Sequence, residues 1–201
     1  MRLDHQHIYR LVQAETNVLD LGCGDGALLA ELMKGKNIKG QGVEMNEACI
    51  YECVEKGVDV FHSNIEEGLQ GYPDGSFDYV ILNQSLQQVK NITFVFEEAL
   101  RVGKQVIVGI PNFAHIHARL RLFLLGKTPK TKSLPYDWST TPNVRFMSLW
   151  DFRTFCKLNQ IQILAAVALG KKQTVKICPN MFALDGIFLL EKERQSTHSS
   201  Q

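Results

Sequence analysis

The chain has 201 residues, which is enough for one compact domain and short for two. Its 22 basic and 21 acidic side chains nearly cancel, so no overall positive field points to nucleic acid as a partner. The polar N-terminus and the lack of an apolar window of about 18–20 residues predict neither a signal peptide nor a membrane span, and hence a cytoplasmic protein. Five scattered cysteines without a CxxC pair predict reduced thiols, not disulfides or a metal site.

The first half of the chain alternates short apolar runs with amphipathic stretches, a pattern typical of strand–helix units. The pattern predicts a helix at 4–13, a strand at 17–21 and a helix at 26–34 that stops at Gly35. It then predicts a strand at 40–43, a helix that is capped by Asn46 and runs to residue 56, and strands at 58–62 and 77–82. Residues 63–75, between the last two strands, are predicted to be a loop.

The second half predicts a helix at 93–101 and a strand at 104–110, and then loses its regularity over residues 111–142. This stretch, with one apolar and basic helix at 114–125, is too long for a simple connection, so we expect a lid or a partner-binding insertion. A helix at 149–158 and strands at 161–169 and 183–191 follow, and the two strands are expected to pair antiparallel. The polar tail at 194–201 is predicted to be disordered.

Together these elements predict an α/β fold, a Rossmann-like doubly wound and mostly parallel sheet with an antiparallel last strand. Residues 1–193 are expected to form one domain.

The decisive motif is the segment VLDLGCGDG at residues 18–26. A strand that ends in alternating glycines lets the backbone approach a ligand closely, and the helix that follows offers free N–H groups. Asp20 and Asp25 would repel a pyrophosphate but attract a cofactor that carries a sulfonium and an ammonium group. The GxGxG spacing also lacks the third glycine of a dinucleotide fingerprint. S-adenosylmethionine (SAM) is therefore favoured over NAD, and an NAD-dependent oxidoreductase is the disfavoured alternative.

An acidic residue is expected at the end of the second strand, where a carboxylate can accept hydrogen bonds from both ribose hydroxyls. Glu44 stands at that place, about 20 residues beyond the loop. Considered apart from the glycine loop, Glu44 could equally well be interpreted as a surface residue that caps the next helix.

These residues resemble the class I SAM-dependent methyltransferases over roughly residues 4–110, and nearly the whole chain is similar to the methionine-biosynthesis MetW family. The segments that carry the second resemblance are MRLDH at 1–5, VLDLGCGDG at 18–26, FDYVILNQ at 77–84, LRVG at 100–103, PNF at 111–113 and LPYDW at 134–138. The resemblance implies a SAM-binding fold, with S-adenosylhomocysteine (SAH) as the product form. It also implies a role near the homoserine O-acyltransferase step of methionine synthesis.

Carried over residue by residue, the class pattern implies a cofactor site with a loop, a ribose carboxylate, an adenine contact and a boundary toward the substrate. The implied cofactor-binding residues are Asp20, Gly22, Cys23, Gly24, Asp25, Gly26, Glu44, Met45, Asn64, Ile65, Asn83 and Gln84. Asn64 stands where the class often has an aspartate for the adenine amino group. The Asn-Pro-Pro-Tyr motif of methyltransferases that act on amino groups of bases and glutamine is missing after the fourth strand, which argues against adenine methylation.

No catalytic base is evident from the motifs. The candidates are His115 and His117, whose alternate spacing predicts that at most one faces the pocket, and Tyr136 in a possible lid with Asp137 and Trp138.

Two hypotheses for the function remain. The first, which the fold favours and which is our main prediction, is methyl transfer from SAM to a small acceptor. The second is a non-catalytic SAM-binding accessory or regulatory partner of homoserine O-acyltransferase.

Overall fold

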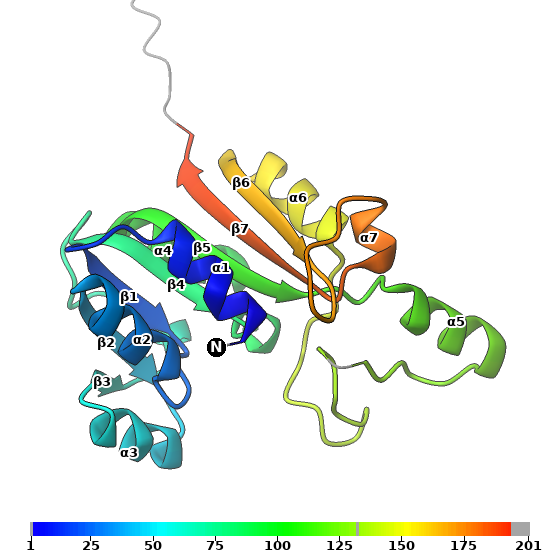
Figure 1. Ribbon diagram of the computed structural model, residues 1–201, viewed down its shortest axis with the longest axis horizontal. Helices are drawn as coiled ribbons and strands as arrows, with labels where there is room; N and C mark the ends of the chain where they lie inside the picture. Colours follow the sequence, from blue (N-terminus) through cyan, green and yellow to red (C-terminus); the bar gives the residue numbers. More distant parts are fainter. Residues whose placement is uncertain (1, 132, 194–201) are drawn as a thin grey trace, which may run out of the picture.

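The described residues of this computed structural model, 2–131 and 133–193, form a seven-stranded sheet in the order β3-β2-β1-β4-β5-β7-β6 (Figure 1). The strands are β1 (Asn17–Leu21), β2 (Lys39–Glu44), β3 (Asp59–His62), β4 (Phe77–Asn83), β5 (Gly103–Pro111), β6 (Ile161–Leu169) and β7 (Asp185–Lys192). β7 runs antiparallel to both of its neighbours, and the other pairs are parallel. The predicted mostly parallel sheet with an antiparallel last strand is therefore confirmed.

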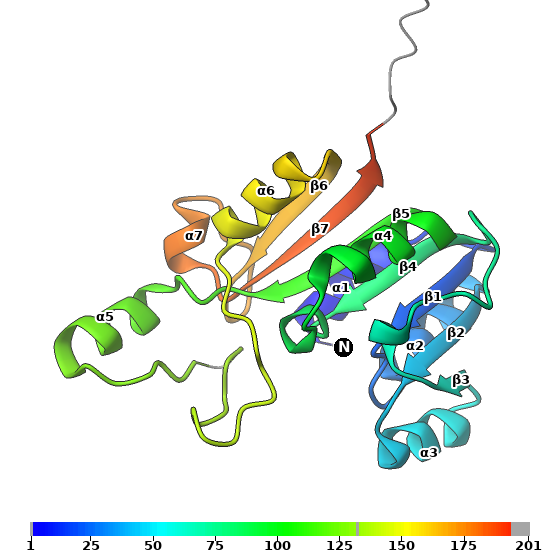
Figure 2. The same ribbon diagram turned by 180° about the vertical axis from the view of Figure 1, so that it is seen from behind.

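Helices cover both faces of the sheet, as Figures 1 and 2 show from opposite sides. They are α1 (Leu3–Leu11), α2 (Ala27–Lys36), α3 (Glu47–Glu55), α4 (Ile92–Val102), α5 (Ile116–Leu125), α6 (Leu149–Leu158) and the short α7 (Pro179–Phe182), with 3-10 turns at Ile65–Glu67 and Leu86–Gln88. α1, α2 and α3 enclose one apolar core, and α4 and α6 enclose the other. This two-sided burial explains why the central strands are mostly apolar.

Most element boundaries agree with the sequence pattern, and the differences have local causes. The bounds of β1, α6 and β6 are as predicted, and Asn46 caps α3 by accepting from the Ala48 and Cys49 amides. α2 does not stop at Gly35 but continues to Lys36, because Asn37 adopts the left-handed conformation (φ 53°) that ends the helix. α5 begins at Ile116, since His115 is its N-cap.

Residues 114–142, which we call the arm, leave the sheet after β5 and return before α6 (Figure 1). Hydrogen bonds fix the base of the arm: the Asn112 side chain donates to the Asn180 and Ala183 carbonyls, and the Phe113 amide donates to the Met147 carbonyl. The only buried residue of α5 is Ala118. The arm is thus anchored at its two ends while its helix is largely uncovered.

None of the helices within 2–131 and 133–193 is both long and apolar enough to cross a bilayer.

A capping box marks the point where the chain leaves the arm and enters α6. The Ser148 hydroxyl and the Asp151 amide and carboxylate are bonded reciprocally. We expect Ser148→Ala to lower the free energy of unfolding by about 0.5–2 kcal/mol, because it leaves the Asp151 amide without its side-chain acceptor. Urea denaturation would measure the change, with Ser139→Ala, on an exposed turn, as the control. Equal stability of the two variants would contradict the role of this cap.

Candidate cofactor site

The loop after β1 has a backbone shape that depends on its glycines. Gly22, Gly24 and Gly26 have φ angles of 77°, 55° and 70°, which side chains rarely allow. A Cβ atom at Gly22 would lie 2.8 Å from Ser85 Cβ, and one at Gly26 would lie 2.8 Å from Cys53 Sγ. At Gly24 a Cβ would meet no atom within 4 Å. The loop is therefore packed against the protein at both ends and open at its middle glycine.

Two buried thiols support the loop from behind. Cys53 Sγ donates to the Gly24 carbonyl at 3.1 Å and lies 3.8 Å from Cys23 Sγ. Burial raises the pKa of both thiols, so they stay protonated and act as small apolar groups with weak hydrogen bonds.

Asp20 is the most unusual charged residue of the site. It is 2% exposed, and its Oδ1 atom has no hydrogen-bond partner. Burial and the neighbouring Glu44 raise the pKa of Asp20 to about 7. A buried carboxylate without a partner is costly unless a cation or a donor approaches it, so Asp20 is poised to accept a positively charged or hydrogen-bonding ligand.

Glu44 connects the end of β2 to the glycine loop. Its Oε2 accepts from the Gly24 amide at 2.9 Å, and its Oε1 accepts from the Met45 and Asn46 amides at 2.8 and 2.9 Å. These three bonds use three of the four lone pairs of the carboxylate, so Glu44 can shape the loop and still accept one hydrogen bond from a ligand hydroxyl at Oε2.

Asp25 has local partners already. The Ala27 amide donates to its carboxylate at 3.2 Å, and Lys56 Nζ lies 3.3 Å from Oδ2. Partial burial would raise the pKa of Asp25, but this amide and the Lys56 ammonium outweigh it and hold the pKa below its usual value. Asp25 therefore stabilises the start of α2 and keeps less charge free for a ligand than Asp20 does.

The residues expected near an adenine lie around the ends of β2 and β3. Met45 is 58% exposed beside Glu44. The Asn64 side chain accepts from the Glu66 amide at 2.9 Å and thereby caps the 3-10 turn Ile65–Glu67. Ile65 packs partly against the core. Asn64 thus has a structural partner for its amide oxygen, and Met45 and Ile65 offer apolar surface.

Asn83 and Gln84 lie at the carboxyl end of β4 and join this edge to a buried carboxylate, Asp4, and a partly buried one, Asp185. Asn83 Nδ2 donates to Asp4 Oδ2 at 3.0 Å, and Gln84 Nε2 donates to Asp185 Oδ1 at 3.2 Å. Burial raises the pKa of Asp185, while hydrogen bonds from Ser133 and Gln84 partly oppose the shift. The two amides therefore link the pocket edge to α1 and to the start of β7.

The pocket itself also includes residues that the motif analysis did not identify. A hollow of about 120 Å³ is lined by the glycine loop, Asp20, Asn83 and Gln84, and also by Arg2, His5 and Leu28. His5 Nδ1 lies 3.5 Å from Glu31 Oε2. Arg2 and His5 come from α1 and the residue before it, which pack over the carboxyl edge of the sheet. The hollow is smaller than the ~300–1,000 Å³ of typical ligand pockets, so a nucleoside would extend onto the surface around Glu44 and Met45.

The three candidate catalysts from the sequence do not line this hollow. His115 and His117 lie at the start of α5 with their rings stacked, 5.1 Å between centroids, so the expectation that they point in different directions was wrong. The reason is that His115 is the N-cap and its Nδ1 accepts from the His117 amide. Tyr136 lines a separate hollow of the arm together with Arg121 and Trp138.

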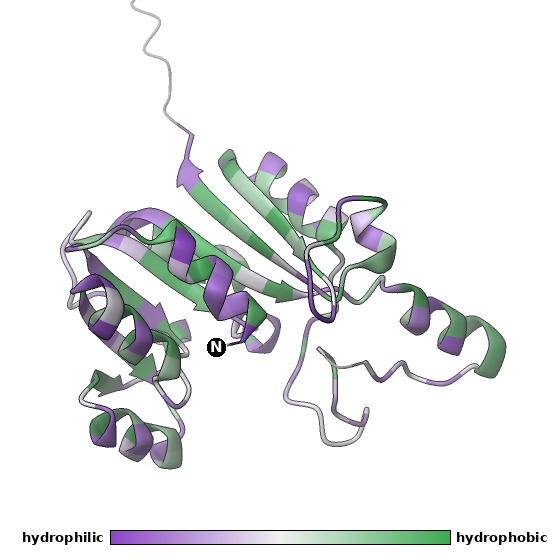
Figure 3. Ribbon diagram, in the orientation of Figure 1, coloured by the Kyte–Doolittle hydropathy of each residue, from purple (hydrophilic) through white to green (hydrophobic). Residues whose placement is uncertain are grey.

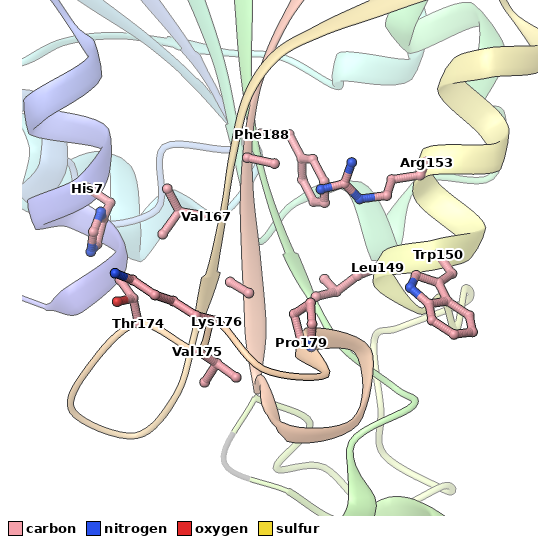
Figure 4. A pocket seen from close by; sticks show the side chains of 12 residues that line it. His7, Leu149, Trp150, Arg153, Val167, Thr174, Val175, Lys176, Pro179 and Phe188 are labelled. Atoms are coloured by element: carbon pink, nitrogen blue, oxygen red, sulfur yellow. The ribbon is translucent and has the colours of Figure 1, made fainter.

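A larger pocket of about 460 Å³ is lined by residues of α1, the edge strand β6 and α6 (Figure 4). Its floor is apolar, with Phe188 and Val167, and its charged or titratable lining groups are His7, Arg153 and Lys176. Without a carboxylate in its lining, this pocket does not suit a sulfonium or ammonium group. The hollow at the glycine loop, in contrast, has Asp20 and Asp25 in its lining.

The chain matches the family model described as methionine biosynthesis protein MetW over residues 2–190. It is also 35% identical over 208 residues to a bifunctional methionine biosynthesis protein MetXA/MetW of Rhodopirellula baltica. That alignment covers 97% of this chain and 33% of the relative, so the chain spans about a third of the relative's length.

Solved structures share the fold at low sequence identity. A SAM-dependent methyltransferase of Thermotoga maritima, described as a possible histamine N-methyltransferase, matches with a TM-score of 0.70 and 19% identity over 94% of this chain and 88% of that one. The [4+2]-cyclase SpnF matches with a TM-score of 0.68 and 16% identity over 95% and 81% of the two chains. The fold is that of the class I SAM-dependent methyltransferases, and by its family match the chain belongs to the MetW family of methionine biosynthesis.

Proposed function

We propose that this chain binds SAM or SAH at the glycine loop and acts in methionine biosynthesis as a regulatory partner of homoserine O-acyltransferase. The observation that carries the cofactor assignment is Asp20, a buried carboxylate whose Oδ1 lacks a partner at the end of β1. A bound cofactor with an ammonium and a sulfonium group would supply the missing positive charge.

The residues around Asp20 fit such a cofactor. Gly24 leaves open space for a close approach to the backbone, and Glu44 has one lone pair left, on Oε2, for a ribose hydroxyl. Arg2 lines the same hollow and is suited to a carboxylate, while Met45 and Ile65 offer apolar surface for a base. When bound, SAM would supply an electrophilic methyl group. The chain's own groups would bind and orient it.

The regulatory role is supported by the relative from Rhodopirellula baltica, in which MetXA and MetW parts share one chain. Linking two parts in this way raises their effective concentration and favours pairs that work in contact. We take the MetXA part to be the acyltransferase that the family resemblance implies. A protein that binds the methyl donor made from methionine could report the supply of the end product to that enzyme, through a coupling between the two binding equilibria.

Methyl transfer to a small acceptor is the second candidate function, and one observation favours it. His5 lines the hollow and lies 3.5 Å from Glu31, an arrangement in which an imidazole could accept a proton from an acceptor and share the charge with a carboxylate. An acceptor would have to enter between α1 and the end of β4.

Calorimetric titration with SAM and SAH, with and without the homoserine O-acyltransferase of the same cell, tests the proposal. We expect at least one of the two ligands to bind the isolated chain. When the acyltransferase is added, the affinity for that ligand should change, and the factor of the change measures the coupling between the two binding equilibria. Absence of ligand binding in both settings would contradict the cofactor assignment. Ligand binding that the acyltransferase leaves unchanged would contradict the regulatory role.

Substitution of Gly24, compared with a matched control, should separate the effect of the open loop on ligand binding from its effect on stability. Gly24→Ala places a Cβ in the open space of the loop, so we expect at least about tenfold weaker SAH binding and a stability loss of about 1–2 kcal/mol from the positive φ angle. Gly75→Ala is the matched control, because Gly75 also has a positive φ (64°) and open space around it, but lies in a remote turn. Equal SAH affinity of the two variants would place the ligand elsewhere.

The raised pKa of Asp20 gives the site a pH dependence. The folded chain holds a proton on Asp20 up to a pKa of about 7, whereas the unfolded chain releases it near pH 3.8, so stability falls as the pH rises between these values. We expect the wild type to lose roughly 2–3 kcal/mol relative to Asp20→Asn between about pH 5 and about pH 8, as measured by urea denaturation.

The affinity for SAM should depend on the same titration in the opposite direction: it should rise with pH, whereas the free energy of unfolding falls. Ionised Asp20 is the form that attracts a cation, so SAM should bind several-fold more tightly at pH 7.5 than at pH 6, and Asp20→Asn should bind weakly at both. A wild type and an Asp20→Asn variant with parallel pH profiles would refute the role of this carboxylate.

A further inference from the structure

The arm exposes an unusual amount of apolar surface. On α5, Phe123 is 85% exposed, Leu124 68% and Leu125 63%, and Figure 3 shows this helix as mostly hydrophobic at the end of the molecule. Trp138, farther along the arm, is 76% exposed. Soluble proteins seldom leave such clusters of large apolar side chains in water unless another molecule covers them.

The apolar side chains point to several sides of α5. At about 100° per residue, Leu120 and Leu124 lie on one side of the helix, whereas Leu122 and Leu125 lie on another. An amphipathic helix that rests on a membrane needs one apolar face and one polar face. A helix with apolar side chains on several sides and arginines between them is suited to a protein groove that can also pair its charges. The pattern therefore favours a groove that surrounds the helix over a flat lipid surface.

The charge of the arm indicates which charges the partner should have around that groove. Residues 114–142 contain five basic side chains and one acidic side chain, Asp137, which pairs with Lys130 at 2.6 Å. Arg121, Lys127 and Lys130 line a hollow of about 380 Å³ together with Tyr136 and Trp138. A second copy of this chain would bring the same positive charge to a symmetric contact, which is unfavourable. A partner with carboxylates around an apolar groove is complementary.

We propose that the arm is the docking surface for a partner protein, with α5 inserted into an apolar groove that is rimmed by carboxylates. That this partner is the homoserine O-acyltransferase rests on the proposed function.

Docking on the arm would reach the cofactor site through a short chain of polar contacts. Ser133 on the arm is close enough to Asp185 to lower the pKa of its carboxyl group, and Asp185 accepts a hydrogen bond from Gln84, which lines the hollow beside the glycine loop. A partner that shifts the arm would therefore change the position of Gln84. This gives the coupling between partner and ligand a physical route.

The test compares two substitutions of exposed apolar residues in the full chain. Phe123→Glu adds a negative charge at the centre of the proposed surface, and Leu158→Glu adds the same charge at the 77% exposed end of α6. Affinity for the acyltransferase would be measured by biolayer interferometry, and SAH affinity of the isolated variants by calorimetry. We expect Phe123→Glu to weaken acyltransferase binding at least about tenfold, as for loss of a buried aromatic anchor, and Leu158→Glu to bind as the wild type does.

The charge requirement is tested with Arg121→Glu and with salt. We expect Arg121→Glu to slow association with the acyltransferase several-fold, and added salt to reduce the difference from the wild type, because complementary charges act mainly on the association rate.

Five results would overturn the inference. If the wild type and Phe123→Glu bind the acyltransferase equally, the partner docks elsewhere although the proposed association stands. If the wild type does not bind the acyltransferase at all, the proposed regulatory function fails and this inference fails with it. If the wild type forms dimers and Phe123→Glu dissociates them, the arm binds a second copy of the chain. If the wild type binds anionic vesicles and Phe123→Glu abolishes this binding, the arm binds a membrane. A weaker SAH affinity of isolated Phe123→Glu would make the arm a lid.

Discussion

The hydrogen bond from the Gly24 amide to Glu44 is the contact on which the site depends. It joins the loop after β1 to the end of β2, two parallel strands whose carboxyl ends meet at the same edge of the sheet. With the loop held in this shape, the Gly26 end packs on Cys53, and Gly24 faces open space. Glu44 would then have two roles, because the carboxylate that fixes the loop also stands where a ribose would lie. A ligand at this place would meet a site that is already formed, which reduces the entropy lost on binding.

Much of this site could be predicted from the sequence because its parts are local. A strand, three alternating glycines and a helix define the loop, and the alternation of strands and helices places Glu44 at the next strand end. The parallel sheet then brings these two short segments together without further information. The fold followed for the same reason: the apolar central strands and the irregular stretch after residue 110 were visible in the pattern.

The contribution of α1 could not be predicted, because it depends on packing between distant parts of the chain. Arg2 and His5 reach the hollow only since α1 lies against the sheet, and Asn83 binds Asp4 across 79 positions in the sequence. The interpretation of His115 failed for a local reason instead. A histidine before a helix can accept from a backbone amide, and this cap determines the direction of its ring.

Fold and reaction are separate questions for this architecture. The [4+2]-cyclase SpnF shares the fold, so the fold alone does not imply methyl transfer. The near-zero net charge of this chain conceals an uneven distribution of charge: the buried Asp20 and the partly buried Glu44 lie at the ends of β1 and β2, and basic and apolar groups lie on the arm. Opposite charges in separate places favour two different ligands, a small cation in the hollow and an acidic partner on the arm. Since Ser133, Asp185 and Gln84 connect the two places, a ligand that orders one would alter the free energy of binding at the other, which is the physical requirement for regulation.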